Sequence, residues 1–361
     1  FVIQGAESGP TGVMRLHRPL RMVGRILTRG SVGFAESYMA GEWSTPDIAH
    51  LLELMQRNED AYQQRMEPSW VGRLRLFLHH RRRKNTQRGS RRNISAHYDL
   101  GNEFYRHWLD ETMTYSAAIF EYPEQPLADA QRAKYRQLLD AINAKPGEHV
   151  LEIGCGWGGF ALEAAQRGLR VTGLTLSTEQ LAWARRRIAD AGLSDQVELR
   201  LQDYRDTRGQ FDHAVSIEML EAVGEAYWPA YFRMLHDRVK PGGTIGLHGI
   251  TIEEHRFEEY RRSPDFIQRY IFPGGMLPTL KRLVDEARKA HMTVIEKTSL
   301  GQHYADTLLQ WDARFVRALP DIYRLGFDNR FVNMWRYYLG YCYSGFRTES
   351  IDVMRLVMQR P

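Results

Sequence analysis

One stretch, VLEIGCGWGGF at residues 150–160, constrains the fold more than any other part of the chain. An apolar run leads into a loop with four glycines, and small and apolar residues at helical spacing follow at once. Glycine allows a sharp turn and a close approach of the backbone to a ligand, where a Cβ would clash. The free N–H groups at the start of the next helix then point at that ligand. The stretch therefore predicts a strand, a ligand-binding loop and a helix.

Strand and helix patterns alternate after this loop. Apolar runs predict further strands at 169–177, 197–204, 211–219 and 241–251, and helical patterns lie at 160–168, 179–193 and 227–239. Such alternation predicts an α/β fold with a mostly parallel sheet that has helices on both faces. Ligands in these folds bind beyond the carboxyl ends of the strands, so the residues that follow each strand are the first candidates for a site.

The end of the second predicted strand lacks an acidic residue, which disfavours a dinucleotide as the ligand. A dinucleotide enzyme usually carries an acid there for the ribose hydroxyls, but residues 174–177 are Leu, Thr, Leu and Ser. Asp203, after the third strand, is well placed for an adenine amino group, and its alternative role is a helix cap. In its GxGxG form, GCGWGG is similar to the S-adenosylmethionine loop of Rossmann-like methyltransferases.

Positive charge gathers ahead of the glycine loop. Residues 81–92, RRRKNTQRGSRR, carry seven positive charges and no acid, in a chain of net charge +5. Such a run favours an anionic membrane surface or another polyanion, and the alternative is a solvated linker. No aromatic stacking platform accompanies it, which disfavours nucleic acid. The segment at 70–84 predicts a basic amphipathic helix that either lies on a bilayer or packs on the main domain.

Other features of the sequence indicate the cellular compartment and exclude some kinds of catalytic site. The sequence has no run of about 18 apolar residues, so it predicts no membrane span. Its two cysteines, Cys155 and Cys342, fit a reducing cytoplasm. The histidines are scattered without the spacing of a zinc site, and no GxSxG elbow indicates a hydrolase. Because the first residue is Phe1, we expect the natural start to precede it.

Several strings resemble the cyclopropane fatty acid synthase family. They are HYDLGNEFY, TYSAAIF, VLEIGCGWGG, LTLSTEQ, QDYRD, SIEMLEAVG, YIFPGG and YSGFR, in the family's order over residues 93–347. The resemblance implies a Rossmann-like class I methyltransferase that uses S-adenosylmethionine. It also implies a small N-terminal helical domain at 1–80 that binds lipid, a basic linker at 81–92, and a catalytic domain at 93–361 with a helical lid at about 251–307.

The resemblance also assigns roles residue by residue. Glu221 matches the family's active-site glutamate, and His248 and Ile250 match positions that line a bicarbonate site. Two expected contacts with that anion are missing, because Ala117 stands for a cysteine and Asp312 for a tyrosine. The implied cofactor-binding positions are Tyr115, Ser116, Gly154, Cys155, Gly156, Trp157, Gly158, Thr175, Leu176, Gln180, Gln202, Asp203 and Tyr204.

These positions suit methyl transfer to the double bond of an unsaturated acyl chain. The transfer leaves a carbocation, which carboxylates and aromatic faces stabilise. The candidates for that role are Glu221, Tyr270, Phe272, Trp311 and Tyr338. A base must then remove a proton, and in place of bicarbonate we expect His248, Glu218 or Asp312. The expected product is a cyclopropane, and the alternative is a methylene- or methyl-branched chain.

The expected substrate is an unsaturated phospholipid, because the N-terminal unit resembles the extra domain of the family's phospholipid-acting members. We therefore expect a bilayer with anionic lipids as the partner, and a cytoplasmic enzyme peripheral to the inner membrane face. A homodimer is implied by the resemblance alone, and we expect neither a metal nor a nucleic acid. A lipid-binding protein without catalytic activity is the alternative from another class.

Overall fold

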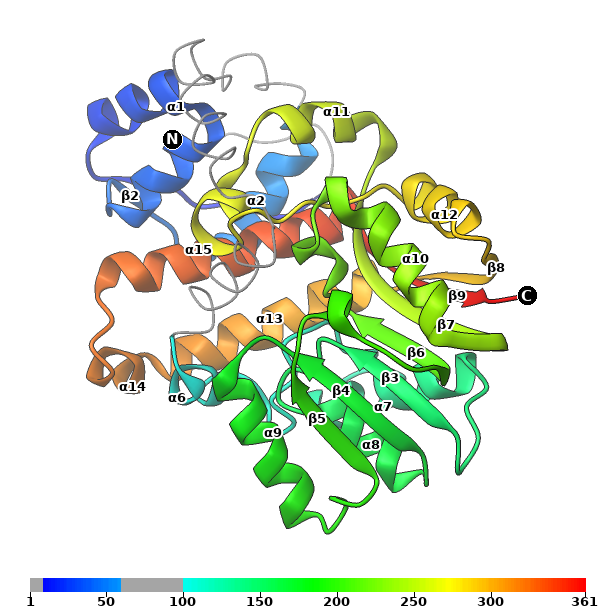
Figure 1. Ribbon diagram of the computed structural model, residues 1–361. Coiled ribbons are helices and arrows are strands. Elements are labelled where there is room, and N and C mark those ends of the chain that lie inside the picture. Colours follow the sequence, from blue (N-terminus) through cyan, green and yellow to red (C-terminus); the bar gives the residue numbers. More distant parts are fainter. Residues whose placement is uncertain (1–8, 60–99) are drawn as a thin grey trace.

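A seven-stranded sheet forms the centre of the computed structural model, which describes residues 9–59 and 100–361 (Figure 1). The strand order is β5-β4-β3-β6-β7-β9-β8. The five strands from β3 to β7 run parallel, and β9 pairs antiparallel with both β7 and β8. Their bounds are β3 His149–Ile153, β4 Arg170–Thr175, β5 Val197–Leu201, β6 Phe211–Ile217, β7 Val239–Ile252, β8 Thr293–Ser299 and β9 Ile351–Gln359. The predicted α/β class and mostly parallel sheet are confirmed.

Helices cover both faces of this sheet. Successive strand residues point to opposite faces, so Val150 packs in one apolar cluster and Leu151 in the other. The cluster with Val150 contains residues of α7 (Leu127–Ala141), α8 (Gly159–Gln166) and α9 (Thr178–Asp190). The cluster with Leu151 contains residues of α10 (Trp228–Arg238) and α12 (Leu280–Lys289). Burial on both faces explains why the inner strand β3 and most of β6 are apolar in the sequence, whereas the edge strand β5 alternates between buried and exposed positions.

A third layer joins the N-terminal segment to the C-terminal helices. Helices α1 (Pro19–Met39) and α2 (Ile48–Arg57) pack on α15 (Asn329–Arg347), which lies beside α13 (Gly301–Arg317). The remaining elements of this layer are α6 (Asn102–Arg106), α14 (Leu319–Arg324) and a small ribbon of β1 (Arg15–Leu16) and β2 (Trp43–Ser44). One apolar cluster spans all of these helices, so the described N-terminal residues share a core with the rest of the chain.

Local sequence features explain two helices of this layer. The Asp47 side chain accepts a hydrogen bond from the His50 N–H and so caps the start of α2. The aromatic-rich C-terminal stretch forms α15. The predicted helix at 70–84, the basic linker at 81–92 and the expected domain boundary at residue 80 lie outside the described residues.

The expected lid at 251–307 is shorter in the structure. Helix α11 (Glu254–Arg262) and a π-helical turn, η5 (Ile267–Ile271), follow β7, but α12 and β8 belong to the sheet and its cover. Strand β8 alternates between exposed and half-buried positions, which left it without the apolar run that marks the parallel strands. No helix in residues 9–59 and 100–361 is long and apolar enough to cross a membrane.

Candidate active site

A cavity of about 390 Å³ lies at the carboxyl ends of the parallel strands. The glycine loop, the turns after β4 and β6, η5 and α15 all contribute to its wall. Such an edge is where the ligand is expected in this type of sheet. The lining includes sixteen residues that the sequence singles out: Tyr115, Ser116, Gly154, Cys155, Gly156, Trp157, Thr175, Leu176, Gln180, Gln202, Tyr204, Glu218, Glu221, Ile250, Phe272 and Tyr338.

The glycine loop has a shape that larger residues would not adopt. Gly154 has a φ of +88°, and a Cβ there would come within 2.9 Å of the Met219 Cγ. The N–H groups of Gly154 and Cys155 both donate to the Leu174 carbonyl, at 2.9 and 2.8 Å. Gly158 lies outside the cavity lining: it precedes α8 in the left-handed region, and a Cβ there would lie 3.0 Å from that of Ala184.

The cavity also contains a buried acid that sequence reasoning missed. Glu152, at the end of β3, lines the cavity, and its Oε2 has no hydrogen-bond partner among the described residues. Burial raises the pKa of this carboxyl to about 8. An unpartnered carboxylate beside the glycine loop is a ready acceptor for a cationic group, which fits the ammonium and sulfonium of S-adenosylmethionine. Its position in the run VLEIG, which reads as buried strand, concealed this role.

The turn after β4 has its polar groups held in place. The Thr175 hydroxyl donates to the Gln180 side-chain oxygen at 3.1 Å, and the Ser177 hydroxyl accepts from the Gln180 N–H at 3.2 Å. Asp203, in contrast, lies outside the cavity lining. Its two carboxylate oxygens accept from Arg205 at 2.8 Å each, and it also accepts from the Arg205 N–H. The helix-cap interpretation of Asp203 is therefore the one that the structure favours.

Glu218, directly after β6, has an unusual backbone and a well-defined carboxylate. Its φ is +50°, in the left-handed region that costs a non-glycine residue about 1–2 kcal/mol. Its Oε1 accepts from the Ala117 N–H at 2.8 Å, and its side chain also bonds to Tyr304 on α13. Burial raises the pKa of this carboxyl, against the opposing charge of Lys134. Strain of this kind persists where the surroundings hold a functional group in place.

Glu221 provides a second carboxylate in the same cavity. Its Oε1 accepts from the Ile250 N–H, and its Oε2 has no partner among the described residues. Burial raises its pKa to about 8, and the nearby Glu218 acts in the same direction. A cation inside the cavity would lower the pKa of both carboxyl groups. The two carboxyl groups are therefore suited to stabilise a positive charge that develops inside the cavity.

A buried lysine balances part of this negative charge. Lys134 on α7 is fully buried, and its ammonium donates to the Ser116 hydroxyl at 2.5 Å and to the Gln131 side-chain oxygen at 2.7 Å. Burial lowers its pKa to about 7, and the charge of Glu218 opposes that shift. Lys134 thus holds the Ser116 hydroxyl at the cavity wall and interacts electrostatically with Glu218.

Three expected catalytic residues lie elsewhere. His248 is fully buried in β7 outside the cavity lining, and burial lowers its pKa well below the ordinary value. Asp312 accepts from Arg336 through both oxygens at 3.1 Å, also away from the lining. The Tyr270 hydroxyl donates to Glu36 at 2.6 Å rather than reaching the cavity. His248 is thus buried in neutral form, Asp312 is held in an ion pair and Tyr270 in a hydrogen bond, each outside the cavity lining. Trp311 is likewise buried outside the lining.

The tyrosine expected near the active site is Tyr304, not Asp312. Tyr304 lines the cavity, bonds to Glu218, and has a pKa raised well above the ordinary value by burial and by that carboxylate. The signal was present in HYADTLLQW, where Tyr304 precedes Trp311 by seven residues and so shares its helix face. Of the other aromatic candidates, Phe272 and Tyr338 do line the cavity.

The cavity continues toward the N-terminal segment. Its far wall includes Gln56, Arg256 and Ser350, and these three residues also line a second cavity of about 570 Å³. Between the two ends, α15 contributes a largely apolar wall that includes Tyr341, Cys342 and Phe346. The hollow therefore runs from the cofactor loop, past two carboxylates, to a polar opening beside α2 and α11.

Comparisons with known proteins agree with this geometry. The family model described as Mycolic acid cyclopropane synthetase matches residues 85–356. The chain is 41% identical to Tuberculostearic acid methyltransferase UfaA1 of Mycobacterium tuberculosis, over 99% of this chain and 85% of that protein. It is 34% identical to Cyclopropane-fatty-acyl-phospholipid synthase of Escherichia coli, over 93% of this chain and 85% of that protein.

A solved structure extends the comparison to the fold. The mycolic acid cyclopropane synthase CmaA1, complexed with SAH and CTAB, superposes with a TM-score of 0.70 at 32% identity. The match covers 74% of this chain and 98% of that one. A relative solved with SAH therefore supports S-adenosylmethionine as the cofactor of this family.

Proposed function

This chain belongs to the mycolic acid cyclopropane synthetase family, and we propose that it methylates the double bond of unsaturated acyl chains in membrane phospholipids. The observation that carries the proposal is Glu218, a carboxylate buried in the cavity and held by Ala117 and Tyr304. In this proposal Glu218 takes the proton that the acyl chain must lose after methyl transfer. No separate anion is needed, which explains why the cysteine contact expected at Ala117 is dispensable.

The enzyme is an S-adenosylmethionine-dependent methyltransferase, and the cavity fits that cofactor. The glycine loop and Glu152 would hold its methionine end, and Thr175, Gln180 and Gln202 would lie along its nucleoside. When bound, it supplies a methyl group activated on a sulfonium. The chain's own task is alignment, because a plain alkene is a weak nucleophile that reacts only at close, dry contact.

The groups around the double bond would then stabilise positive charge on the acyl chain. Glu221 has an unpartnered Oε2 in the cavity, and the rings of Phe272 and Tyr338 line the same wall. Cation–π contacts contribute about 0.5–2 kcal/mol each, and an aimed carboxylate contributes more where water is excluded. As the charge develops, both glutamates favour their ionised forms, which readies Glu218 to accept a proton at its carboxylate.

We propose a methylene- or methyl-branched acyl chain as the product. The 41% identical relative, which matches 99% of this chain, is named for methyl transfer. A cyclopropane is the second candidate, favoured by the family model and by the Escherichia coli relative, both named for ring formation. All outcomes start from the same cation: loss of a proton from the new methyl carbon closes the cyclopropane, and loss from a neighbouring chain carbon gives a methyl-branched alkene. A methylene chain forms when a hydride shifts from the methylated carbon to the cation before the methyl carbon loses its proton.

The phospholipid bilayer remains the proposed site of action. We place the enzyme at the cytoplasmic face of the inner membrane, with anionic lipids as partners and the N-terminal segment as the lipid-binding part; a homodimer is also proposed. The Escherichia coli relative is named for fatty-acyl phospholipid, which supports this substrate class. A catalytically inactive lipid-binding protein is the rival that experiment must exclude.

Incubation with lipid vesicles and labelled cofactor tests the proposal. The full chain is mixed with vesicles of a monounsaturated phospholipid and S-adenosylmethionine that carries a deuterated methyl group. We expect deuterium in the acyl chains, with NMR signals of an exomethylene or a methyl branch. Cyclopropane ring signals would support the second candidate, and vesicle binding without label in the lipid would overturn the proposed activity.

A further inference from the structure

The first half of α1 has an apolar face that nothing in the described residues covers. Leu20, Val23 and Leu27 are 88%, 45% and 64% exposed, at spacings of three and four residues that place them on one helix face. Met22 and Ile26, on another face of the same helix, pack against the main apolar cluster. The half-helix is therefore apolar toward the core and apolar again toward solvent.

The charge around this face has a single sign. Residues 13–29 contain five arginines and no acid. Arg15, Arg18 and Arg21 form no ion pair within residues 9–59 and 100–361. Val13 and Leu16, just before the helix, are also about half exposed and extend the apolar surface. Exposed leucines among unpaired arginines match the interface of an anionic bilayer, which offers acyl chains below and phosphates above.

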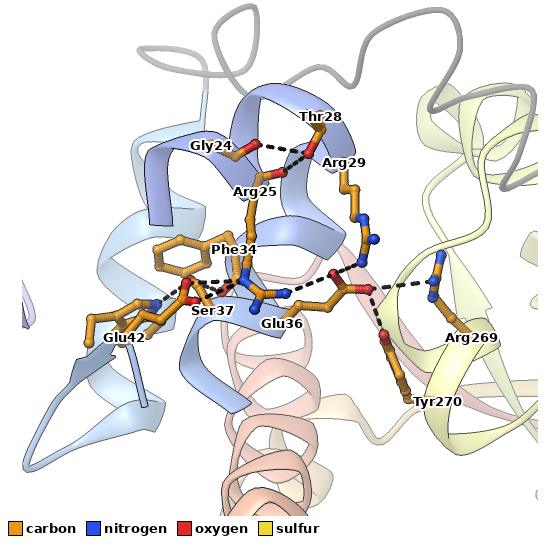
Figure 2. Close-up of polar contacts among 11 residues, drawn as sticks. Gly24, Arg25, Thr28, Arg29, Phe34, Glu36, Ser37, Glu42, Arg269 and Tyr270 are labelled. Atoms are coloured by element: carbon orange, nitrogen blue, oxygen red, sulfur yellow. Dashed lines mark hydrogen bonds and ion pairs between the residues drawn. The ribbon is translucent and has the colours of Figure 1, made fainter. Parts of the chain in front are cut away.

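This half-helix is fixed rather than free to fold away. Gly30 has a φ of +61° and breaks α1, so that the second half turns back beneath the first. The turn is so close that a Cβ on Gly33 would lie 2.1 Å from the Arg25 carbonyl oxygen. Arg25 then reaches Glu42 at 3.0 Å through its Nε, and Arg29 reaches Glu36 (Figure 2). The exposed face is therefore a built surface of the folded protein.

Glu36, the partner of Arg29, also connects the half-helix to the cavity wall. Glu36 is buried and also accepts from the Tyr270 hydroxyl at 2.6 Å, and Arg269 lies 3.5 Å from its carboxylate (Figure 2). Both partners belong to η5, whose Ile267 and Gln268 line the cavity. Figure 1 shows α1 and α11 on the same side of the molecule, away from β3, β4 and β5. Arg256 of α11 lines the polar end of the cavity, so that end belongs to the side of the molecule on which α1 lies.

We propose that the surface formed by Leu16, Leu20, Val23 and Leu27, with Arg15, Arg18 and Arg21, inserts into an anionic phospholipid bilayer and orients the cavity opening toward it. This inference rests on the proposed phospholipid substrate and identifies the surface that reaches it. The leucines enter the acyl boundary, and the arginines bind lipid phosphates at its edge. The contacts of Glu36 with Arg29 of α1 and with Tyr270 of η5 hold the cavity wall in a fixed position relative to α1, and so relative to the membrane.

Vesicle flotation of the full chain without cofactor tests the surface. The variant Leu20→Asp/Leu27→Asp is compared with Ile295→Asp, which changes a residue 54% exposed on the edge strand β8. With vesicles of equal parts phosphatidylglycerol and phosphatidylcholine, we expect the double variant to bind at least about tenfold more weakly and the control to bind like the wild type. Wild-type binding should also fall when salt is raised or phosphatidylglycerol is omitted.

Two further measurements keep the outcomes distinct. Thermal unfolding of both variants checks that they fold, and methyl transfer to detergent-dispersed phospholipid should be unchanged in the double variant. Undiminished vesicle binding by that variant would overturn the proposal that this surface inserts into the bilayer. If the variant also lost dimers in sedimentation, the face would instead be a contact between copies of the chain. Absence of transfer by the wild type in detergent would instead count against the proposed function and leave the binding result to stand.

Discussion

Replacing Glu36 by alanine should cost about 3 kcal/mol of unfolding free energy. The carboxylate is 1% exposed and accepts from Tyr270, and it lies within ion-pair distance of Arg25, Arg29 and Arg269. Breaking a buried ion pair costs about 3–5 kcal/mol when a charge is left buried. Here the arginines are 27–47% exposed and regain water, which moves the expected cost to the lower end of that range.

Urea unfolding measures this cost, with a surface pair as the control. Glu103 and Arg106 form an ion pair 2.9 Å long in which both side chains are more than half exposed, so Glu103→Ala should change stability by less than about 0.5 kcal/mol. The two variants are compared at equal m values, so that a shift in midpoint reports stability. A cost below about 1 kcal/mol for Glu36→Ala would refute the view that this buried carboxylate fastens α1 to η5.

Three further predictions concern the cavity. Burial raises the pKa of Glu152 and Glu221 to about 8 and lowers the pKa of Lys134 to about 7. Between about pH 5 and 8 the folded protein therefore binds more protons at the two glutamates than the unfolded chain does. Above about pH 7 it binds fewer protons at the lysine. Stability should therefore fall from about pH 5 to 7 and rise again above about pH 8, by at most about 1.4 kcal/mol per pH unit for each group; a steady rise in the unfolding midpoint across this range would contradict the shifts. Glu218→Gly should be about 1 kcal/mol more stable than Glu218→Ala, because both variants lose the contacts with Ala117 and Tyr304 and only glycine adopts a φ of +50° freely, while methyl transfer falls in both; equal stability of the two variants in calorimetry would argue against backbone strain. Ala117→Cys should leave activity independent of added bicarbonate, because Glu218 already occupies the Ala117 N–H, and a new bicarbonate requirement would show that the anion site is intact.

The sequence predicts the parallel part of the fold well, because the inner strands β3, β4 and β6 are buried at nearly every position and must be largely apolar, and helical patterns follow the strands. It also predicts the glycine loop, since Gly154 needs a positive φ and has no room for a Cβ. Strands β8 and β9 escape notice for different reasons. The edge strand β8 has only alternate half-buried positions, whereas β9 is buried at most positions but lies outside the alternation of strands and helices that marks the parallel sheet.

Contacts between distant residues set a second limit. Glu218 bonds to Ala117 and to Tyr304, which lie 101 and 86 positions away in the chain, so nothing local ranks it above other acids. Conversely, Asp312 and Asp203 look available in the sequence, but Arg336 and Arg205 bind their carboxylates in the folded protein. A candidate list from motifs thus gives the residue types of the site, and only the fold shows which of them remain free to react.

Methyl transfer by Glu218→Gln tests the central claim most directly. Glutamine keeps an oxygen for the Ala117 N–H but no longer accepts a proton, so cofactor binding should persist. In assays with unsaturated phospholipid, purged of bicarbonate, we predict full activity of the wild type and at least about a hundredfold lower product formation by the variant. Activity of Glu218→Gln close to that of the wild type, or a wild type that requires bicarbonate, would contradict the assignment of Glu218 as the proton acceptor.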